Sequence, residues 1–216
     1  MSKLTPEKFK TIGGHPCLDF VNTVSGRVPT RDAKDIAGYT IIRDKFLKYI
    51  DLLSWAQKVK LISDEEIEML RKLAEKDERS ADAVLVRAVR LREALYRIVK
   101  SIVEDRDPGG DDLGLLNEEL RIGRQHEHLD HRDKRFELRV EEVESSLDSL
   151  LWLVSRSAAD LLRSERLERV RQCPGDECWW LFLDESRNHT RQWCDMRECG
   201  NRAKVRRFRA DKRANI

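Results

Sequence analysis

Four cysteines near one end of the 216-residue sequence stand in two pairs that have the spacing of a metal site. Four residues separate Cys173 from Cys178, four separate Cys194 from Cys199, and fifteen lie between the two pairs. Thiolates are preferred ligands of zinc, and a tetrahedral site takes one such pair from each side of the ion. The pattern therefore predicts a structural Zn²⁺ site in which protein fills every position, so catalysis by this metal is not expected.

Ordinary buried thiols or two disulfides are the alternative interpretation of these cysteines. The sequence has no apolar run long enough for a membrane span and no apolar secretion segment at its start, so we expect a cytoplasmic protein without a membrane partner. In that reducing compartment, clustered cysteines favour metal binding over disulfides. His189 lies between the two pairs and is an alternative ligand in place of one thiolate.

The cysteine segment is too short to fold by itself. About forty residues bury too little apolar surface, whereas a structural zinc ion adds roughly 10–16 kcal/mol of apparent binding free energy to folding. We therefore expect two domains, a body over residues 1–166 and a zinc finger with a basic helix over residues 167–216.

The residues after the cysteines are strongly basic. From residue 186 to residue 216, ten Lys and Arg stand against three Asp and Glu, a net charge of +7 in a chain whose total is +2. Ala, Arg and Lys after Gly200 predict a helix whose Val205 and Phe208 pack on the zinc module. The basic side chains can bind phosphates of nucleic acid. The candidate contacts are Arg187, Arg191, Arg202, Lys204, Arg206, Arg207, Arg209 and Arg213. A solvated charged face or a protein-interaction tail is the alternative.

The elements that position this site are mostly helical. Apolar residues at helical spacing predict helices near 44–60, 63–73, 80–102, 113–121 and 143–163. A capping box begins the second of them at Ser63, and Ser80 is a candidate cap for the third. Alternation at 136–140 predicts a hairpin with 125–129. The expected fold is mainly α with a small β-hairpin (α+β), a helical N-terminal domain plus a small C-terminal four-cysteine zinc finger.

The C-terminal motif resembles the CGNR zinc-finger family of bacterial proteins. The four cysteines carry the likeness together with residues 180–184, 186–188 and the tetrapeptide Cys-Gly-Asn-Arg at 199–202. At the other end, Gly13-Gly14 followed by Leu-Asp-Phe-Val-Asn-Thr at 18–23 resembles the start of the ABATE domain. The resemblance implies zinc on the four cysteines and a stress-related transcription regulator, and it makes DNA the expected partner.

Two polar residues in the ABATE-like start, Asp19 and Asn22, stand three positions apart. They either line a pocket for a small-molecule effector or serve as local capping and turn residues, and we favour the second interpretation. Cys17 is either a small buried side chain or a redox or metal residue beside His15.

Three histidines, His126, His128 and His131, cluster in the predicted hairpin. His126 and His128 would share one face of a strand, which suits a metal ion, whereas a solvated strand edge is the alternative. The sequence shows no nucleophile elbow, phosphate-binding loop or dinucleotide fingerprint, so we expect no enzyme.

These features together predict a DNA-binding transcription regulator. The zinc finger would contact DNA, and the body would sense a ligand or form a homodimer. The alternative is a zinc-stabilised adaptor that binds protein or RNA. An enzyme with its site near Asp19 and Asn22 is a third hypothesis.

Overall fold

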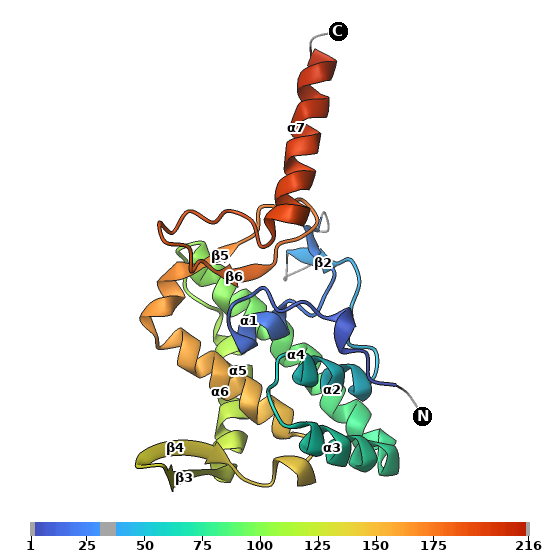
Figure 1. Ribbon diagram of the computed structural model, residues 1–216, viewed down its shortest axis with the longest axis vertical. Coiled ribbons are helices and arrows are strands. Elements are labelled where there is room, and N and C mark those ends of the chain that lie inside the picture. Colours follow the sequence, from blue (N-terminus) through green and yellow to red (C-terminus); the bar gives the residue numbers. More distant parts are fainter. Residues whose placement is uncertain (1–2, 31–37, 215–216) are drawn as a thin grey trace.

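A bundle of helices forms the body of the protein, and one further helix projects from it (Figure 1). This computed structural model describes residues 3–30 and 38–214, without the side chains at positions 132, 213 and 214. The α-helices in the described ranges are α1 (Pro16–Val21), α2 (Tyr49–Lys58), α3 (Asp64–Lys76), α4 (Glu78–Val103), α5 (Gly110–Gly123), α6 (Ser149–Leu162) and α7 (Asn201–Ala214). None of these helices is long and apolar enough to cross a membrane.

The described strands form three separate antiparallel pairs. They are β1 (Arg27–Pro29) with β2 (Tyr39–Ile41), β3 (Glu127–Arg132) with β4 (Arg135–Val140), and β5 (Val170–Gln172) with β6 (Leu181–Leu183). Short 3₁₀ turns cover Pro6–Lys8, Arg124–His126, Val143–Ser145 and Glu165–Arg169, and a π-helical turn covers Met196–Gly200. The predicted mainly α fold with a zinc finger is confirmed, and two strand pairs join the one hairpin that was expected.

The helix starts follow local side-chain chemistry. The capping box of α3 is present, with hydrogen bonds of 3.2 Å from Glu66 N to Ser63 Oγ and 2.7 Å from Ser63 N to Glu66 Oε2. Helix α4 begins two residues before Ser80, because the carboxylate of Asp77 accepts the Ser80 N–H at 3.0 Å and so caps the helix. Helix α2 starts at Tyr49, later than the predicted start at Asp44. Asp44 instead accepts two hydrogen bonds of 2.7 Å from Arg92.

Helix α4 lies at the centre of the body. It contacts α1, α2, α3 and α5, as well as β5 and β6 from the far end of the chain. The buried core accordingly includes Leu91 and Leu95 of α4 together with Val170, Leu181 and Leu183 of the β5–β6 hairpin. The β5–β6 hairpin, which leads into the zinc module, therefore contributes to the hydrophobic core of the body.

A buried ion-pair network fixes β1 against α4. Arg27 is fully buried and donates to Glu93 at 3.1 and 3.3 Å, while its guanidinium lies 3.8 Å from the centre of the Tyr96 ring. Burial alone would raise the pKa of Glu93, but Arg27 and Arg92 outweigh that effect and lower its pKa. The strand that follows the ABATE-like start is thus bonded to α4 and, through Arg27 N, to the zinc module.

Candidate metal centre and basic helix

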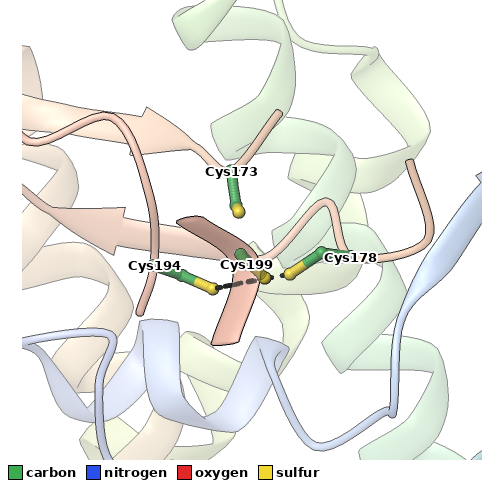
Figure 2. Close-up of side chains that lie close together, drawn as sticks. All are labelled: Cys173, Cys178, Cys194 and Cys199. Carbon is green, nitrogen blue, oxygen red and sulfur yellow. Dashed lines mark hydrogen bonds between the residues drawn. The ribbon is translucent and has the colours of Figure 1, made fainter. Parts of the chain in front are cut away.

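The four predicted ligands meet at one point (Figure 2). The sulfur atoms of Cys173, Cys178, Cys194 and Cys199 all lie within 4.8 Å of one another, with 3.5 Å between Cys178 and Cys194 and 3.6 Å between Cys194 and Cys199. Zinc–sulfur bonds of about 2.3 Å in a tetrahedron require sulfur separations of about 3.8 Å, so the four thiols fit a zinc ion. All four are buried and none forms a disulfide.

His189 takes no part in this cluster. Its side chain is exposed and its Nδ1 lies 3.3 Å from the carbonyl oxygen of Asp184. In the described part of the chain, the four cysteines are the one group of three or more side chains that could hold a metal ion.

A tight turn places the first pair of cysteines. The Cys178 N–H donates to the carbonyl of Gly175 at 2.9 Å, and the Cys173 N–H donates to the carbonyl of Trp180 at 2.8 Å. A Cβ atom at Gly175 would lie 3.1 Å from Cys178 Cβ and within 3.7 Å of two ligand sulfurs. Glycine at this position leaves room for the metal site.

The second pair of cysteines lies just before the start of α7. The Asp195 carboxylate accepts the Arg197 N–H at 2.8 Å, and the Asp195 carbonyl accepts from Cys199 N at 2.9 Å and Gly200 N at 3.2 Å. This π-helical turn continues directly into α7 at Asn201. A metal ion on Cys194 and Cys199 would therefore fix the base of the basic helix.

Strand β6 separates the zinc site from the body. Trp180, just before it, and Phe182 within it pack around the cysteines, while Leu181 and Leu183 point into the core of the body. This alternation is the period-two pattern of a strand that is buried on both faces.

Asn22, a candidate pocket residue for which local capping was the favoured interpretation, instead binds this strand. Its Nδ2 donates to the carbonyl of Leu181 at 2.7 Å and its Oδ1 accepts the Leu181 N–H at 3.1 Å. Asp19 accepts the Gly13 N–H at 2.8 Å, and burial raises its pKa to about 6. Both side chains thus have partners within the chain, and neither lines the cavities beside Leu53, Trp193 or Leu91 in the described part of the chain.

Further bonds join residues 12–27, here called the N-terminal strap, to the zinc module. Leu183 N donates to the Gly13 carbonyl at 2.8 Å, Trp180 Nε1 to the Val24 carbonyl at 3.1 Å, and Arg27 N to the Cys178 carbonyl at 3.1 Å. At Gly26 the approach is so close that a Cβ atom would lie 1.9 Å from the Glu177 carbonyl oxygen. The sequence indicated neither these contacts nor this role for the strap.

Arg191, a predicted nucleic-acid contact, points into the module. Its guanidinium donates to four backbone carbonyls and lies 4.5 Å from the centre of the Phe182 ring; the carbonyls belong to Ile12, Leu183, Trp193 and Cys194. Its N–H binds Asp184, which also accepts two bonds from Ser186. Burial would raise the pKa of Asp184, but these bonds outweigh it and the pKa is lowered.

Helix α7 projects away from the rest of the molecule (Figure 1). Val205 is 48% exposed and Phe208 is 70% exposed, so the prediction that they pack on the zinc module is wrong. The physical reason is direction, because the helix continues the π-helical turn outward from the module. One ion pair, 2.6 Å between Arg206 and Asp176, ties it back.

The basic side chains of α7 are exposed to solvent. Arg202, Arg206 and Arg209 stand at i, i+4 and i+7 and so share one face of the helix, which the sequence analysis did not single out. Among the described residues, Arg202, Lys204, Arg207 and Arg209 have no ion-pair partner, and Arg187 is exposed on the module. The side chain of Arg213 lies outside the described residues.

The three histidines form no metal site in the described part of the chain. His126 precedes β3 and stacks on Trp152 at 3.7 Å, so it does not share a strand face with His128 as predicted. His128 Nδ1 lies 3.2 Å from Glu141 Oε1, and His131 packs against Phe136.

Cys17 is separate from the metal centre. It is buried, and its sulfur lies 3.3 Å from His15 Nδ1. Burial raises the pKa of its thiol, which makes it a poor nucleophile.

Two family models match the sequence. The ABATE model, described as "Putative stress-induced transcription regulator", matches residues 14–165, and the CGNR zinc finger model matches residues 169–212. Both predicted resemblances are confirmed, and neither description names an enzyme. No curated protein matches the chain.

Proposed function

Because the chain belongs to the ABATE family and ends in a CGNR zinc finger, we propose that it is a transcription regulator whose finger and α7 bind duplex DNA. The observation that most supports this proposal is an exposed basic helix that starts at the metal site and projects away from the body. The zinc ion would be structural, holding the helix at a fixed angle to the body. We place this activity in the cytoplasm.

The dimensions of α7 suit the major groove. Fourteen residues make a helix about 21 Å long, and the major groove, about 12 Å wide, admits one helix. On the shared face, Arg202, Arg206 and Arg209 can make forked hydrogen bonds to guanine edges or phosphates. Lys204 and Arg207 point elsewhere and suit the flanking phosphates, as does Arg187.

Arg191 is not part of the proposed DNA-binding surface, because its donors are engaged by carbonyls inside the module. The proposed effector of the body would likewise need a place other than Asp19 and Asn22. The cavity of about 500 Å³ between α2, α3 and α4 is such a place.

The proposal is tested by fluorescence anisotropy with labelled genomic duplex fragments over a salt series. The triple variant Arg202→Ala/Arg206→Ala/Arg209→Ala removes three charges from one face of α7. We expect binding to weaken at least about tenfold, and the slope of log K against log salt to fall by about 3, since each phosphate contact contributes about 0.9. The control Lys58→Ala/Arg79→Ala/Arg90→Ala removes three exposed charges from the body and should bind normally.

Two results would contradict the proposal. An unchanged salt slope in the α7 variant would exclude this face from binding. Recovery of RNA or of a protein without any affinity for duplex DNA would favour the alternative, an adaptor with a structural zinc.

A further inference from the structure

The β3–β4 hairpin extends from the body at the end opposite α7 (Figure 1). Its strands are joined by Asp133 and Lys134, both with positive φ (49° and 64°), as in a two-residue type I′ turn. An isolated two-stranded hairpin is marginally stable in water, so a hairpin of this length is expected to have a partner.

One face of this hairpin carries exposed apolar side chains. Leu129 is 64% exposed, Phe136 70% and Leu138 43%, and Leu129 stands directly opposite Leu138 across the two strands. The other face carries charged side chains. Apolar residues so exposed on one sheet face mark a contact surface.

The outer edge of β4 also has free backbone groups. In a two-residue hairpin the pair that flanks the turn is hydrogen bonded, so residues 135, 137 and 139 direct their N–H and C=O groups toward β3. Phe136, Leu138 and Val140 direct theirs outward. Among the described strands, β4 pairs with β3 alone. Such an edge is a template for another strand.

We propose that this edge binds the same edge of a second copy of the chain. The two β4 strands would pair antiparallel about a twofold axis at Leu138, so that Leu138 faces its own equivalent and Phe136 faces Val140 of the second copy. All three outward residues of each strand would then be hydrogen bonded. The product is a four-stranded antiparallel sheet in the order β3-β4-β4-β3.

Charge complementarity selects this partner and this register. With Leu138 on the axis, Glu137 faces Arg139 of the second copy, and Arg135 faces Glu141 of the second copy; symmetry doubles both pairs. A register shifted by two residues places Glu137 against its own equivalent or Arg139 against its own, and like charges directly opposite are unfavourable. In the described chain, Arg135 and Glu137 have no ion-pair partner and are available for such pairs. Arg139 and Glu141 would share their charge with the partners they have within the chain, Asp130 at 3.3 Å and His128 at 3.2 Å.

The overall charge of the hairpin also favours a second copy of the chain as its partner. Residues 127–140 contain four Asp and Glu and four Lys and Arg, so the hairpin is neutral and offers little to a phosphate backbone or an anionic membrane. Because it lies far from α7 (Figure 1), pairing at β4 would leave the basic helix exposed. The dimer does not depend on the proposed DNA binding.

A charge exchange tests the pairing by sedimentation equilibrium of the zinc-loaded full chain over a concentration series. Glu137→Arg should weaken self-association about tenfold or more, because two attractive pairs become repulsive. Arg139→Glu should do the same. The double variant Glu137→Arg/Arg139→Glu restores opposite charges and should return to within about threefold of the wild type. The control Asp82→Arg makes the same charge change on an exposed site of α4.

Folding of the hairpin does not confound the first variant. Glu137 stands opposite Asp130 in its own chain, and Asp130 also pairs with Arg139 at 3.3 Å, so an arginine at position 137 places a second positive charge next to Asp130. We therefore do not expect Glu137→Arg to weaken association through a less stable hairpin.

Crosslinking provides a second measurement. In a hydrogen-bonded antiparallel pair the two Leu138 Cα atoms would lie about 5.5 Å apart, so Leu138→Cys should couple to its own copy through a short thiol-specific crosslinker. The control Leu129→Cys lies on β3, where three strand spacings separate the copies by about 14 Å, and should not couple. A chain that stays monomeric, equal association in the single and double charge variants, or crosslinking at position 129 alone would overturn the proposal.

Discussion

Asn22 belongs to the body but holds the backbone of the zinc module in place. Both of its amide groups are used by Leu181, and the contact is buried. We expect Asn22→Ala to lower the free energy of unfolding by about 2–4 kcal/mol, because it leaves one buried N–H and one buried C=O unpaired. Urea unfolding measures this effect. Asn117→Ala, at an exposed position of α5, is the matched control, and an equal effect of both variants would contradict the assigned role.

Asp19 makes stability depend on pH. Burial raises its pKa from the ordinary 3.8 to about 6, so between these values the folded chain binds a proton that the unfolded chain does not. The stability that this proton provides is complete below pH 3.8 and is lost as the pH rises through about 6.

The variant Asp19→Asn should lack this dependence, since its amide oxygen can still accept the Gly13 N–H. We expect it to match the wild type at pH 4 and to exceed its free energy of unfolding by about 2–3 kcal/mol at pH 7. The difference between the two unfolding curves measures the effect and cancels the pH dependence of the zinc site. If the wild type and Asp19→Asn have equal free energies of unfolding at pH 7, ionisation of Asp19 does not destabilise the folded chain.

Residue types predicted the metal ligands but not the partners of the strap. The cysteine spacing alone predicts a metal site, because two short turns can bring four thiols together around one ion. Asn22 and Leu181 are 159 positions apart, and no local pattern links an amide side chain to one particular strand. Arg191 was predicted as a nucleic-acid contact, and its internal role was missed for the same reason, since an arginine that binds carbonyls has the same sequence signature as an exposed one.

Among the elements, α7 is expected to contribute to DNA binding but not to the stability of the fold. It contributes no side chain to the buried clusters, and its ion pair to Asp176 is solvent-exposed. We expect a chain that ends at Lys204 to keep its zinc and to change its free energy of unfolding by less than about 0.5 kcal/mol while losing affinity for DNA. Calorimetry and metal analysis on the same sample check this, and a markedly lower melting temperature would show that α7 packs on the body.

Element types were more predictable than element contacts. Helical periodicity located α3, α4 and α6, and alternation located β4, because burial of one face imposes a period on the sequence. The three-residue strands β1 and β2 are too short to show a period. Helix formation after Gly200 followed from propensity, but the exposure of Val205 and Phe208 depends on the direction of the preceding turn, which propensity does not encode.

At the scale of the molecule, the zinc site and the body share β6 and therefore should lose stability together. We expect about one zinc per chain, and Cys194→Ser should lose the ion and lower the melting temperature of the whole helical body, because Leu181 and Leu183 belong to its core. Metal analysis and far-ultraviolet circular dichroism measure the two effects. Cys17→Ala removes the one cysteine outside the cluster and should retain the ion.

Retention of zinc by Cys194→Ser would contradict the ligand assignment. A body that melts normally without zinc would instead separate residues 1–166 from residues 167–216, as the sequence-based division into two domains predicts. That division follows composition and family boundaries, which do not show that one strand is buried from both sides.

The strap also constrains how the chain matures during synthesis. Asn22 leaves the ribosome 159 residues before its partner Leu181, and translation at about 5–20 residues per second makes this a delay of roughly ten to thirty seconds. Throughout that interval the core of the body lacks the wall formed by β5 and β6. If loss of zinc destabilises the body as predicted above, the nascent chain completes its core only when its last cysteines bind the metal, and zinc supply then controls a late step in the production of the protein.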